Sequence, residues 1–156
     1  MICSTDRGVT TVNGWRQDGA VVVFTNGCFD VLHRGHVDLL TRAARLGDYL
    51  VVGLNSDRSV RALKGPDRPY QAENDRAVMM DAMKGVDLVI LFDEDTPLAL
   101  IQALKPAILV KGGDYREEEI VGAPEVRSWG GRVEIIPFLP GYSSTSLINK
   151  IRRSGA

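Results

Sequence analysis

The stretch VVVFTNGCFDVLHRGH, residues 21–36, decides the fold of this chain. Its first five residues are apolar or β-branched and predict a buried strand over residues 21–25. Asn26-Gly27 then turns the chain, and the apolar residues between Val37 and Leu46 recur with the spacing of a helix packed on a sheet. The stretch therefore predicts a strand, a tight turn and a helix in immediate succession.

The residues at the start of this helix predict a site for an anion. His33 and His36 are the two histidines of the chain, and only three positions separate them, so both imidazoles lie on one face of the first helical turn. That turn also offers unpaired backbone N–H groups and the positive end of the helix dipole, which suits phosphate. A lone histidine at a helix start is usually a cap or a surface group. Two histidines within four residues, directly after a glycine turn, favour a functional site.

Composition is that of an ordinary globular protein. The 156 residues are 44% hydrophobic and 25% charged, with a formal net charge of −1, which allows one domain with a full-sized core. The charge gives no sign of a nucleic-acid partner, and no apolar run reaches the ~20 residues of a membrane span. The N-terminus does not resemble a signal peptide. Cys3 and Cys28 are too few and too far apart for disulfides or a zinc site, so free thiols in the cytoplasm are expected.

Short apolar strands alternate with helices along most of the chain. Residues 1–19 predict only a loose N-terminal arm, with a short helix near residues 12–16. The expected strands are residues 21–25, 49–54, 87–92, 107–110 and 133–136, and the expected helices are residues 37–46, 59–63, 72–83, 98–104, 124–129 and 146–153. This alternation predicts a Rossmann-like, doubly wound α/β domain over residues 20–156, with a five-stranded parallel sheet. In such sheets, ligands bind beyond the carboxyl ends of the strands.

Polar clusters follow the expected strands, and each suits part of a nucleoside triphosphate. The backbone of residues 26–29, together with the two histidines, would hold the α- and β-phosphates. Lys64 lies in a Gly-Pro loop and would close over them, although such a lysine by itself is more often only solvated. Ser143, Ser144 and Thr145 open the last helix, and their hydroxyls suit the β- and γ-phosphates. Ordinary N-capping would account for one of these hydroxyls.

The segment from Lys111 to Tyr115 follows the fourth expected strand and suits a purine base. Gly112 and Gly113 have no side chains, so a flat base could lie against the backbone there. Asp114 would cap a turn or accept a hydrogen bond from the base or the ribose. An ordinary Gly-Gly turn explains the same spacing equally well. Arg76 lies on an expected helix, where a surface ion pair is the plain alternative to a nucleotide contact.

The motif around the histidines resembles a family signature, G-x-F-D-x-x-H-x-G-H, at residues 27–36. This signature belongs to the nucleotidyltransferase superfamily of cytidylyltransferases and heptose-phosphate adenylyltransferases. The chain has no G-x-x-x-x-G-K-[ST], so its phosphate site is not a Walker A loop. Across residues 21–152, further segments look like the heptose 1-phosphate adenylyltransferases, which stand alone or form the C-terminal part of bifunctional ADP-heptose synthase. These segments are GLNSDRSVRALKG, DRP, DEDTP, LVKGGDY and STSLINKI.

The resemblance implies a stand-alone enzyme that transfers AMP from ATP to a sugar 1-phosphate, most closely D-glycero-D-manno-heptose 1-phosphate, with release of pyrophosphate. Mg²⁺ is expected with the ATP, and no protein ligand for the metal is evident. The residues expected to act in catalysis are His33, His36 and Lys64. The residues expected to bind the nucleotide are Thr25, Asn26, Gly27, Phe29, Gly35, Arg76, Lys111, Gly112, Gly113, Asp114, Tyr115, Ser143, Ser144 and Thr145.

Two other functions remain open on sequence grounds. One is a cytidylyltransferase that acts on glycerol 3-phosphate or an aminoalcohol phosphate. The other is a nucleotide-binding module without catalysis, which the presence of both histidines disfavours. A homodimer is expected in any of these cases, because relatives of this fold commonly pair and because apolar residues between Met79 and Val89 exceed what a core would need.

Overall fold

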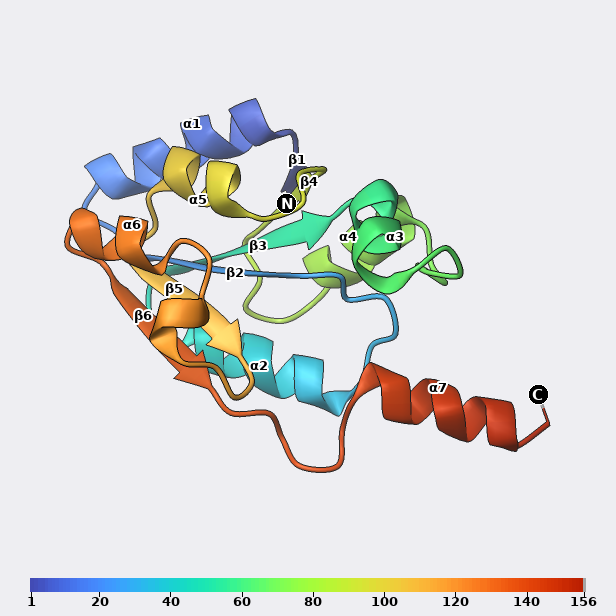
Figure 1. Cartoon of the computed structure of the whole chain (residues 1–156). Coiled ribbons are helices and arrows are strands. Elements are labelled where there is room, and N and C mark those ends of the chain that lie inside the picture. The colour runs from blue at the N-terminus through green and yellow to red at the C-terminus, as the bar shows by residue number, and fades with distance from the viewer. Residues whose placement is uncertain (156) are drawn as a thin grey trace.

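Six parallel strands form the sheet of the computed structural model, which describes residues 1–155, in the order β1-β4-β3-β2-β5-β6 (Figure 1). The strands are β1 (Ile2–Cys3), β2 (Val22–Gly27), β3 (Tyr49–Asn55), β4 (Leu88–Phe92), β5 (Ile108–Gly112) and β6 (Arg132–Ile136). The parallel, doubly wound sheet confirms the predicted fold class. The predicted count of five strands is short by one, because β1 pairs with the edge of β4.

Helices cover both faces of this sheet (Figure 1). They are α1 (Thr5–Gln17), α2 (Arg34–Ala44), α3 (Asp57–Lys64), α4 (Glu73–Asp81), α5 (Leu98–Leu104), the 3₁₀ turn η1 (Glu117–Glu119), α6 (Ala123–Ser128) and α7 (Ser144–Arg153). Apolar residues of α1, α5 and α6 pack in one core cluster, and those of α2 and α4 pack in the other. A strand such as β3 is buried on both sides, so it reads as a continuous apolar run rather than as an alternating pattern.

The first nineteen residues differ from the loose arm that the sequence predicts. They form β1 and the 13-residue helix α1. The Ser4 side chain caps the N-terminus of α1 by accepting a hydrogen bond from the N–H of Arg7. Val12 of α1 is fully buried in the core. Glycines make this segment look irregular, but Gly8 lets α1 approach the sheet, because a Cβ there would overlap the side chain of Ile90. The short helix predicted near residues 12–16 lies within α1, but the first turns were not predicted, because packing, rather than local propensity, stabilises them.

The chain changes direction across the sheet at β2. From β2 it proceeds to β3 and β4 on one side, and it then crosses back to β5 and β6 on the other. Six residue pairs join β2 to β3, but only two join β2 to β5, namely Val23 with Ile108 and Phe24 with Leu109. The carboxyl ends of β2 and β5 therefore part beyond these pairs. Such a switch point is where ligands bind in open α/β sheets.

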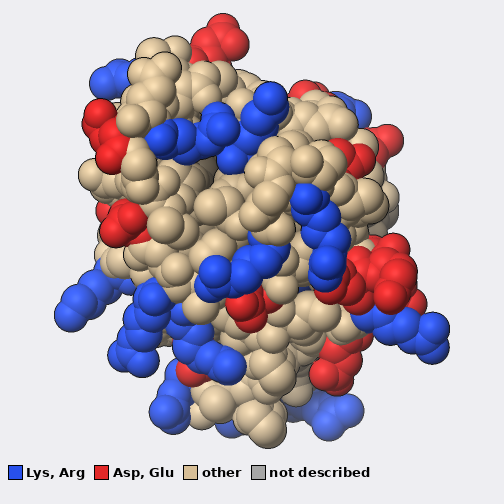
Figure 2. All heavy atoms as spheres, turned by 90° about the vertical axis from the view of Figure 1, so that its left-hand side faces the viewer, with Lys and Arg blue, Asp and Glu red and all other residues tan. Residues whose placement is uncertain are grey.

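The surface carries one projecting helix and charges of both signs. Helix α7 extends from the body of the domain and leads to the C-terminal end (Figure 1). None of its residues is buried, and Ile151 is 48% exposed. On the face in Figure 2, acidic and basic side chains are interspersed around a centre of other residues. No helix within residues 1–155 combines the length and the apolar character needed to cross a membrane.

Candidate active site

Local hydrogen bonds hold the two histidines in the turn between β2 and α2. Nδ1 of His33 accepts a hydrogen bond from the N–H of Gly35 at 3.1 Å, and Nδ1 of His36 accepts one from the N–H of His33 at 3.3 Å. In a neutral imidazole, the nitrogen that accepts carries no proton, so both rings keep their proton on Nε2. The rings stack with their centroids 3.9 Å apart. Each Nε2–H is therefore available to donate to a ligand.

Both imidazoles are uncharged near neutral pH. Burial lowers the pKa of His33 below its ordinary value. Burial, followed by the positive charges of His33 and Lys64, lowers the pKa of His36 to about 4. The pair thus presents two neutral N–H donors, and Lys64 lines the same cavity as His36.

Phe29 supports His36 from within the turn. Its side chain is 4% exposed, and its ring meets the His36 ring edge to face, with the centroids 5.3 Å apart. The backbone of Phe29 has a φ of 47°, which is unusual for a residue with a side chain. Strain of this kind is tolerated where the surroundings fix it, often at functional sites. Phe29 therefore acts on a ligand mainly through the position of His36.

Arg76 is fully buried, so the surface ion pair considered for it is wrong. Its guanidinium donates to the carbonyl oxygens of Gln71, Cys28 and Asn55 and to the carboxylate of Asp57, at distances of 2.7 to 3.0 Å. These bonds tie the ends of β2 and β3 to the start of α4. Because the protein itself occupies the donors, Arg76 holds the walls of the site rather than reaching into it.

Asp30 fastens the loop that follows Lys64, which is the last residue of α3 and not part of the Gly-Pro loop in which the sequence places it. Its carboxylate, 2% exposed, accepts hydrogen bonds from Nε of Arg68 at 2.7 Å and from the N–H groups of Tyr70 and Gln71 at 2.9 Å. Burial alone would raise the pKa of Asp30, but these bonds hold it below its ordinary value. Lys64 itself is exposed. Closure of Lys64 over a nucleotide stays a prediction, and the Asp30 anchor limits it to the tip of the loop.

Nine of the predicted residues line one cavity of about 410 Å³, which we name the central cavity. They are Asn26, Gly27, Phe29, His36, Lys64, Lys111, Gly112, Tyr115 and Ser144. The lining also includes residues outside the predicted set, namely Cys28, Asp30, Leu39, Asn55, Leu63 and Phe138. The switch point between β2 and β5 thus gathers residues from separate parts of the chain around the histidine turn.

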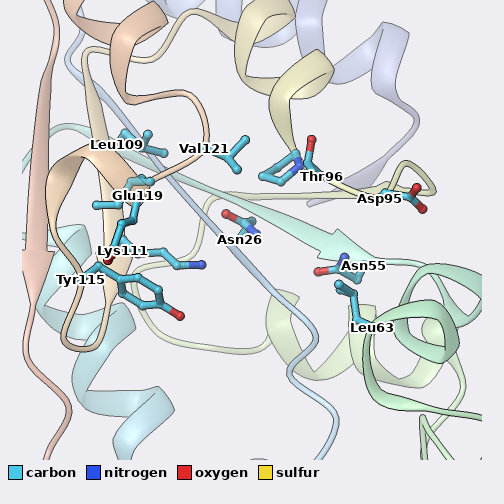
Figure 3. Close-up of a pocket in the computed structure, with 12 residues that line it drawn as sticks. Asn26, Asn55, Leu63, Asp95, Thr96, Leu109, Lys111, Tyr115, Glu119 and Val121 are labelled. Carbon is cyan, nitrogen blue, oxygen red and sulfur yellow. The ribbon is translucent and has the colours of Figure 1, made fainter.

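A second cavity of about 270 Å³, the outer cavity, adjoins the central cavity (Figure 3). The two share the residues Asn26, Asn55, Leu63, Lys111 and Tyr115. In Figure 3, the Lys111 ammonium points into this space from β5, and Thr96 and Asp95 lie across from it. Burial lowers the pKa of Lys111. Asp95, Thr96 and Glu119 supply side-chain oxygen atoms to the outer cavity and do not line the central one. The only signal for them in the sequence is that their segments follow β4 and β5.

A third cavity of about 300 Å³, the basic cavity, lies where the N-termini of α2 and α7 meet. It is lined by Leu32, His33, Arg34, Gly141, Tyr142, Ser143, Ser146, Leu147 and Lys150. Two helix N-termini, an arginine and a lysine make this space favourable for phosphate.

The three hydroxyl residues at the start of α7 have separate roles, with Ser143 as the N-cap and Ser144 and Thr145 as the first two helical residues. Ser143 caps the helix by accepting a hydrogen bond from the N–H of Ser146 at 3.0 Å, as expected for one of them. The hydroxyl of Ser144 donates to the carbonyl of Val31 at 2.8 Å, which ties α7 to the histidine turn. Thr145 is exposed and lines none of the three cavities.

Five further predicted residues also lie outside the three cavity linings, namely Thr25, Gly35, Arg76, Gly113 and Asp114. Thr25 is 1% exposed within β2, whereas Asp114 is exposed to solvent. Gly35 acts through its N–H bond to His33. Direct contacts of these residues with a nucleotide stay predictions.

The site offers donors and cations rather than a protein nucleophile or a metal centre. Burial raises the pKa of Cys28 in spite of nearby Lys64 and Arg76, so its thiol stays protonated and weakly reactive. Within residues 1–155, no group of three or more His, Cys, Asp or Glu is arranged to hold a metal ion. The arrangement therefore suits the binding and polarisation of phosphates.

Residues 24–150 match the sequence model of the cytidylyltransferase-like family. The chain belongs to this family. It is a nucleotidyltransferase, and the resemblance drawn from the histidine motif is confirmed.

Individual relatives agree with the family assignment. The chain is 53% identical over 150 residues to the bifunctional protein HldE of Methylobacillus flagellatus. The aligned residues cover 96% of this chain and 31% of that protein. Identity to the bifunctional protein HldE of Trichlorobacter lovleyi is 60% over 136 residues, with coverages of 87% and 28%. The chain thus spans roughly a third of the length of these relatives. The solved lipopolysaccharide core biosynthesis protein of Thermoplasma volcanium GSS1 has a TM-score of 0.63 and 32% identity, covering 78% of this chain and 98% of that one.

Proposed function

We propose that the enzyme transfers AMP from ATP to a sugar 1-phosphate, with D-glycero-D-manno-heptose 1-phosphate as the acceptor. The products are ADP-heptose and pyrophosphate. An oxygen of the acceptor phosphate forms the new bond to the α-phosphorus, and the bond from that phosphorus to the bridging oxygen of pyrophosphate breaks. Similarity to proteins named bifunctional HldE and to a lipopolysaccharide core biosynthesis protein supports this substrate class.

The order of the three cavities carries the proposal. In an in-line displacement, the nucleophile and the leaving group lie on opposite sides of the phosphorus. The central cavity shares five residues with the outer cavity, and it adjoins the basic cavity at the His33–His36 stack and at the Ser143–Ser144 step. With the α-phosphorus beside His36, pyrophosphate would lie toward the basic cavity. The sugar phosphate would then enter from the outer cavity.

The side chains suit the charge that develops in this step. His33 and His36 would donate their Nε2–H groups to phosphate oxygens as these gain negative charge. Lys64 would approach from the C-terminal end of α3. Lys111 lies where the central and outer cavities join, so it would meet the acceptor phosphate. Catalysis would rest on positioning and charge stabilisation, without a covalent intermediate on the protein.

Mg²⁺ fits the site as a companion of the nucleotide. This ion is commonly held by substrate phosphates with few protein carboxylates, which agrees with the absence of a ligand cluster among residues 1–155. It would supply charge neutralisation on the phosphates. The chain itself contributes the histidine donors and the two lysines that hold those phosphates in place.

A substrate panel tests the proposal. Pyrophosphate release is measured with ATP or CTP at equal, subsaturating concentration, each with heptose 1-phosphate, glycerol 3-phosphate or an aminoalcohol phosphate. We expect release with ATP and heptose 1-phosphate. A CTP rate equal to or above the ATP rate would overturn the proposal in favour of a cytidylyltransferase. Nucleotide binding without turnover for any acceptor would leave only a binding module.

We also propose that the enzyme is a cytoplasmic homodimer, because its substrate ATP is cytoplasmic and because α7 buries none of its residues within the described chain. The apolar surplus expected from Met79 to Val89 is not present, since Met80, Val86 and Val89 belong to the core. Helix α7 has ten residues and none is buried, and a helix of that length is marginal alone. Light scattering at micromolar concentration should give twice the chain mass. A monomer mass contradicts the dimer.

A further inference from the structure

Phe138, in the loop between β6 and α7, is a large aromatic side chain at the edge of the central cavity. It lines that cavity together with His36, Leu39 and Ser144. At 64% exposure, it is the most exposed of the large hydrophobic side chains described. Most of its ring is therefore open, in a place where a ligand of the cavity would meet it.

The two glycines after β5 receive this ring. A Cβ on Gly113 would lie 2.8 Å from Cε2 of Phe138, and a Cβ on Gly112 would lie 3.4 Å from its Cε1. Gly113 also has a φ of 117°, which residues with side chains rarely adopt. The bare backbone that the sequence offers to a purine is thus covered by Phe138. The flat surface that remains open at this position is the ring itself.

We propose that Phe138 is the platform on which the base of the nucleotide stacks, and that it favours the larger purine over a pyrimidine. The proposal rests on the proposed function, because it takes ATP as the donor. A base on this ring would lie at the rim of the central cavity, so that its phosphates could run past Ser144 toward His36. Stacking on an aromatic ring is favourable for any base and grows with the area of overlap.

A base-free probe separates stacking from phosphate binding. Phe138→Ala should weaken ATP binding about tenfold or more, the size expected for loss of one base stack. Binding of inorganic tripolyphosphate should stay unchanged. Because Phe138 is exposed, its removal leaves no hole in the core. The matched control is Val78→Ala, which trims a side chain that is 60% exposed on α4, outside the three cavities described above.

Fluorescence gives a second readout that does not depend on turnover. In Phe138→Trp, the added indole should be quenched by ATP and not by tripolyphosphate, whereas in Val78→Trp neither ligand should change the signal. The proposal is overturned if Phe138→Ala binds ATP as tightly as the parent protein. It is also overturned if the variant loses affinity for ATP and tripolyphosphate equally. Absence of quenching by ATP in Phe138→Trp would overturn it as well. If ATP quenches this variant but heptose 1-phosphate accepts no AMP, the acceptor assignment fails and the stacking role stands.

Discussion

The histidine turn and the wall of the outer cavity are built in different ways. The turn uses neighbours in sequence, and His33, Gly35 and His36 bond to one another within four residues. The outer cavity is lined by Asp95, in the loop after β4, and by Glu119, in the 3₁₀ turn after β5. None of the described hydrogen bonds joins Asp95 to Glu119. The phosphate chemistry that nucleotidyl transfers share is therefore encoded locally. The part of the site that would select an acceptor depends on the whole fold.

The largest expected effect is a loss of stability on substitution of Arg76, which joins these two regions. Arg76 bonds to the histidine turn at the Cys28 carbonyl and to β3 at the Asn55 carbonyl. Arg76→Met would leave these oxygens and the Asp57 carboxylate without their donor. Breaking a buried pair of this kind costs about 3–5 kcal/mol, so the free energy of unfolding in urea should fall by that amount.

The control for Arg76 is Arg58→Met. Arg58 also pairs with a carboxylate, that of Asp93, but its side chain is 58% exposed, and such pairs contribute about 0–1 kcal/mol. Equal losses for the two variants would show that Arg76 does not hold the site together.

The next effect falls on the turn itself. His36→Ala removes the Nε2–H donor that we propose acts on the transferred nucleotidyl group, and loss of one such donor costs about 10²–10³ in rate. ATP affinity should change little, because the other contacts remain. Single-turnover kinetics and ATP titration separate the two quantities, with Val37→Ala as the neighbouring control. Near-normal turnover in His36→Ala would end its catalytic role.

Substitutions in the outer cavity should weaken the binding of the sugar phosphate rather than slow the chemical step. Asp95→Asn and Glu119→Gln keep the size of each side chain but remove a charged acceptor for sugar hydroxyls, a hydrogen bond of about 1.5–3 kcal/mol. The KM for the sugar phosphate should rise about tenfold or more, with the KM for ATP unchanged. Glu118→Gln is the control, because Glu118 is a neighbour that lies outside this cavity. A matching rise in the KM for ATP would mean that the two regions do not divide the substrates.

The same contrast explains what the sequence could predict. The β2 to α2 unit, the later strands and the central residues of the site follow from local patterns, because turn residues and apolar runs specify them directly. Arg76 and Phe138 could not be assigned in this way. The burial of Arg76 depends on the carbonyls of Cys28 and Asn55 from distant segments. The position of Phe138 depends on glycines 25 and 26 residues earlier. The first turns of α1 could not be predicted for a related reason, since Gly8 lowers the helix propensity there while permitting contact with the sheet.

The last prediction concerns the protonation of the histidine turn, which is directly measurable because the chain has only two histidines. The pKa of His36 is lowered to about 4, first by burial and then by His33 and Lys64. An unfolded histidine titrates near 6.5, so between pH 6.5 and 4 the unfolded chain binds a proton that folded His36 does not. Stability should therefore be fully present above pH 6.5 and fall as the pH is lowered through this window. Histidine NMR signals should show His33 titrating below its ordinary value and His36 still neutral at pH 5, with His33→Asn assigning the two resonances. A midpoint for His36 near 6.5 would show that the turn does not hold the imidazole as a neutral donor.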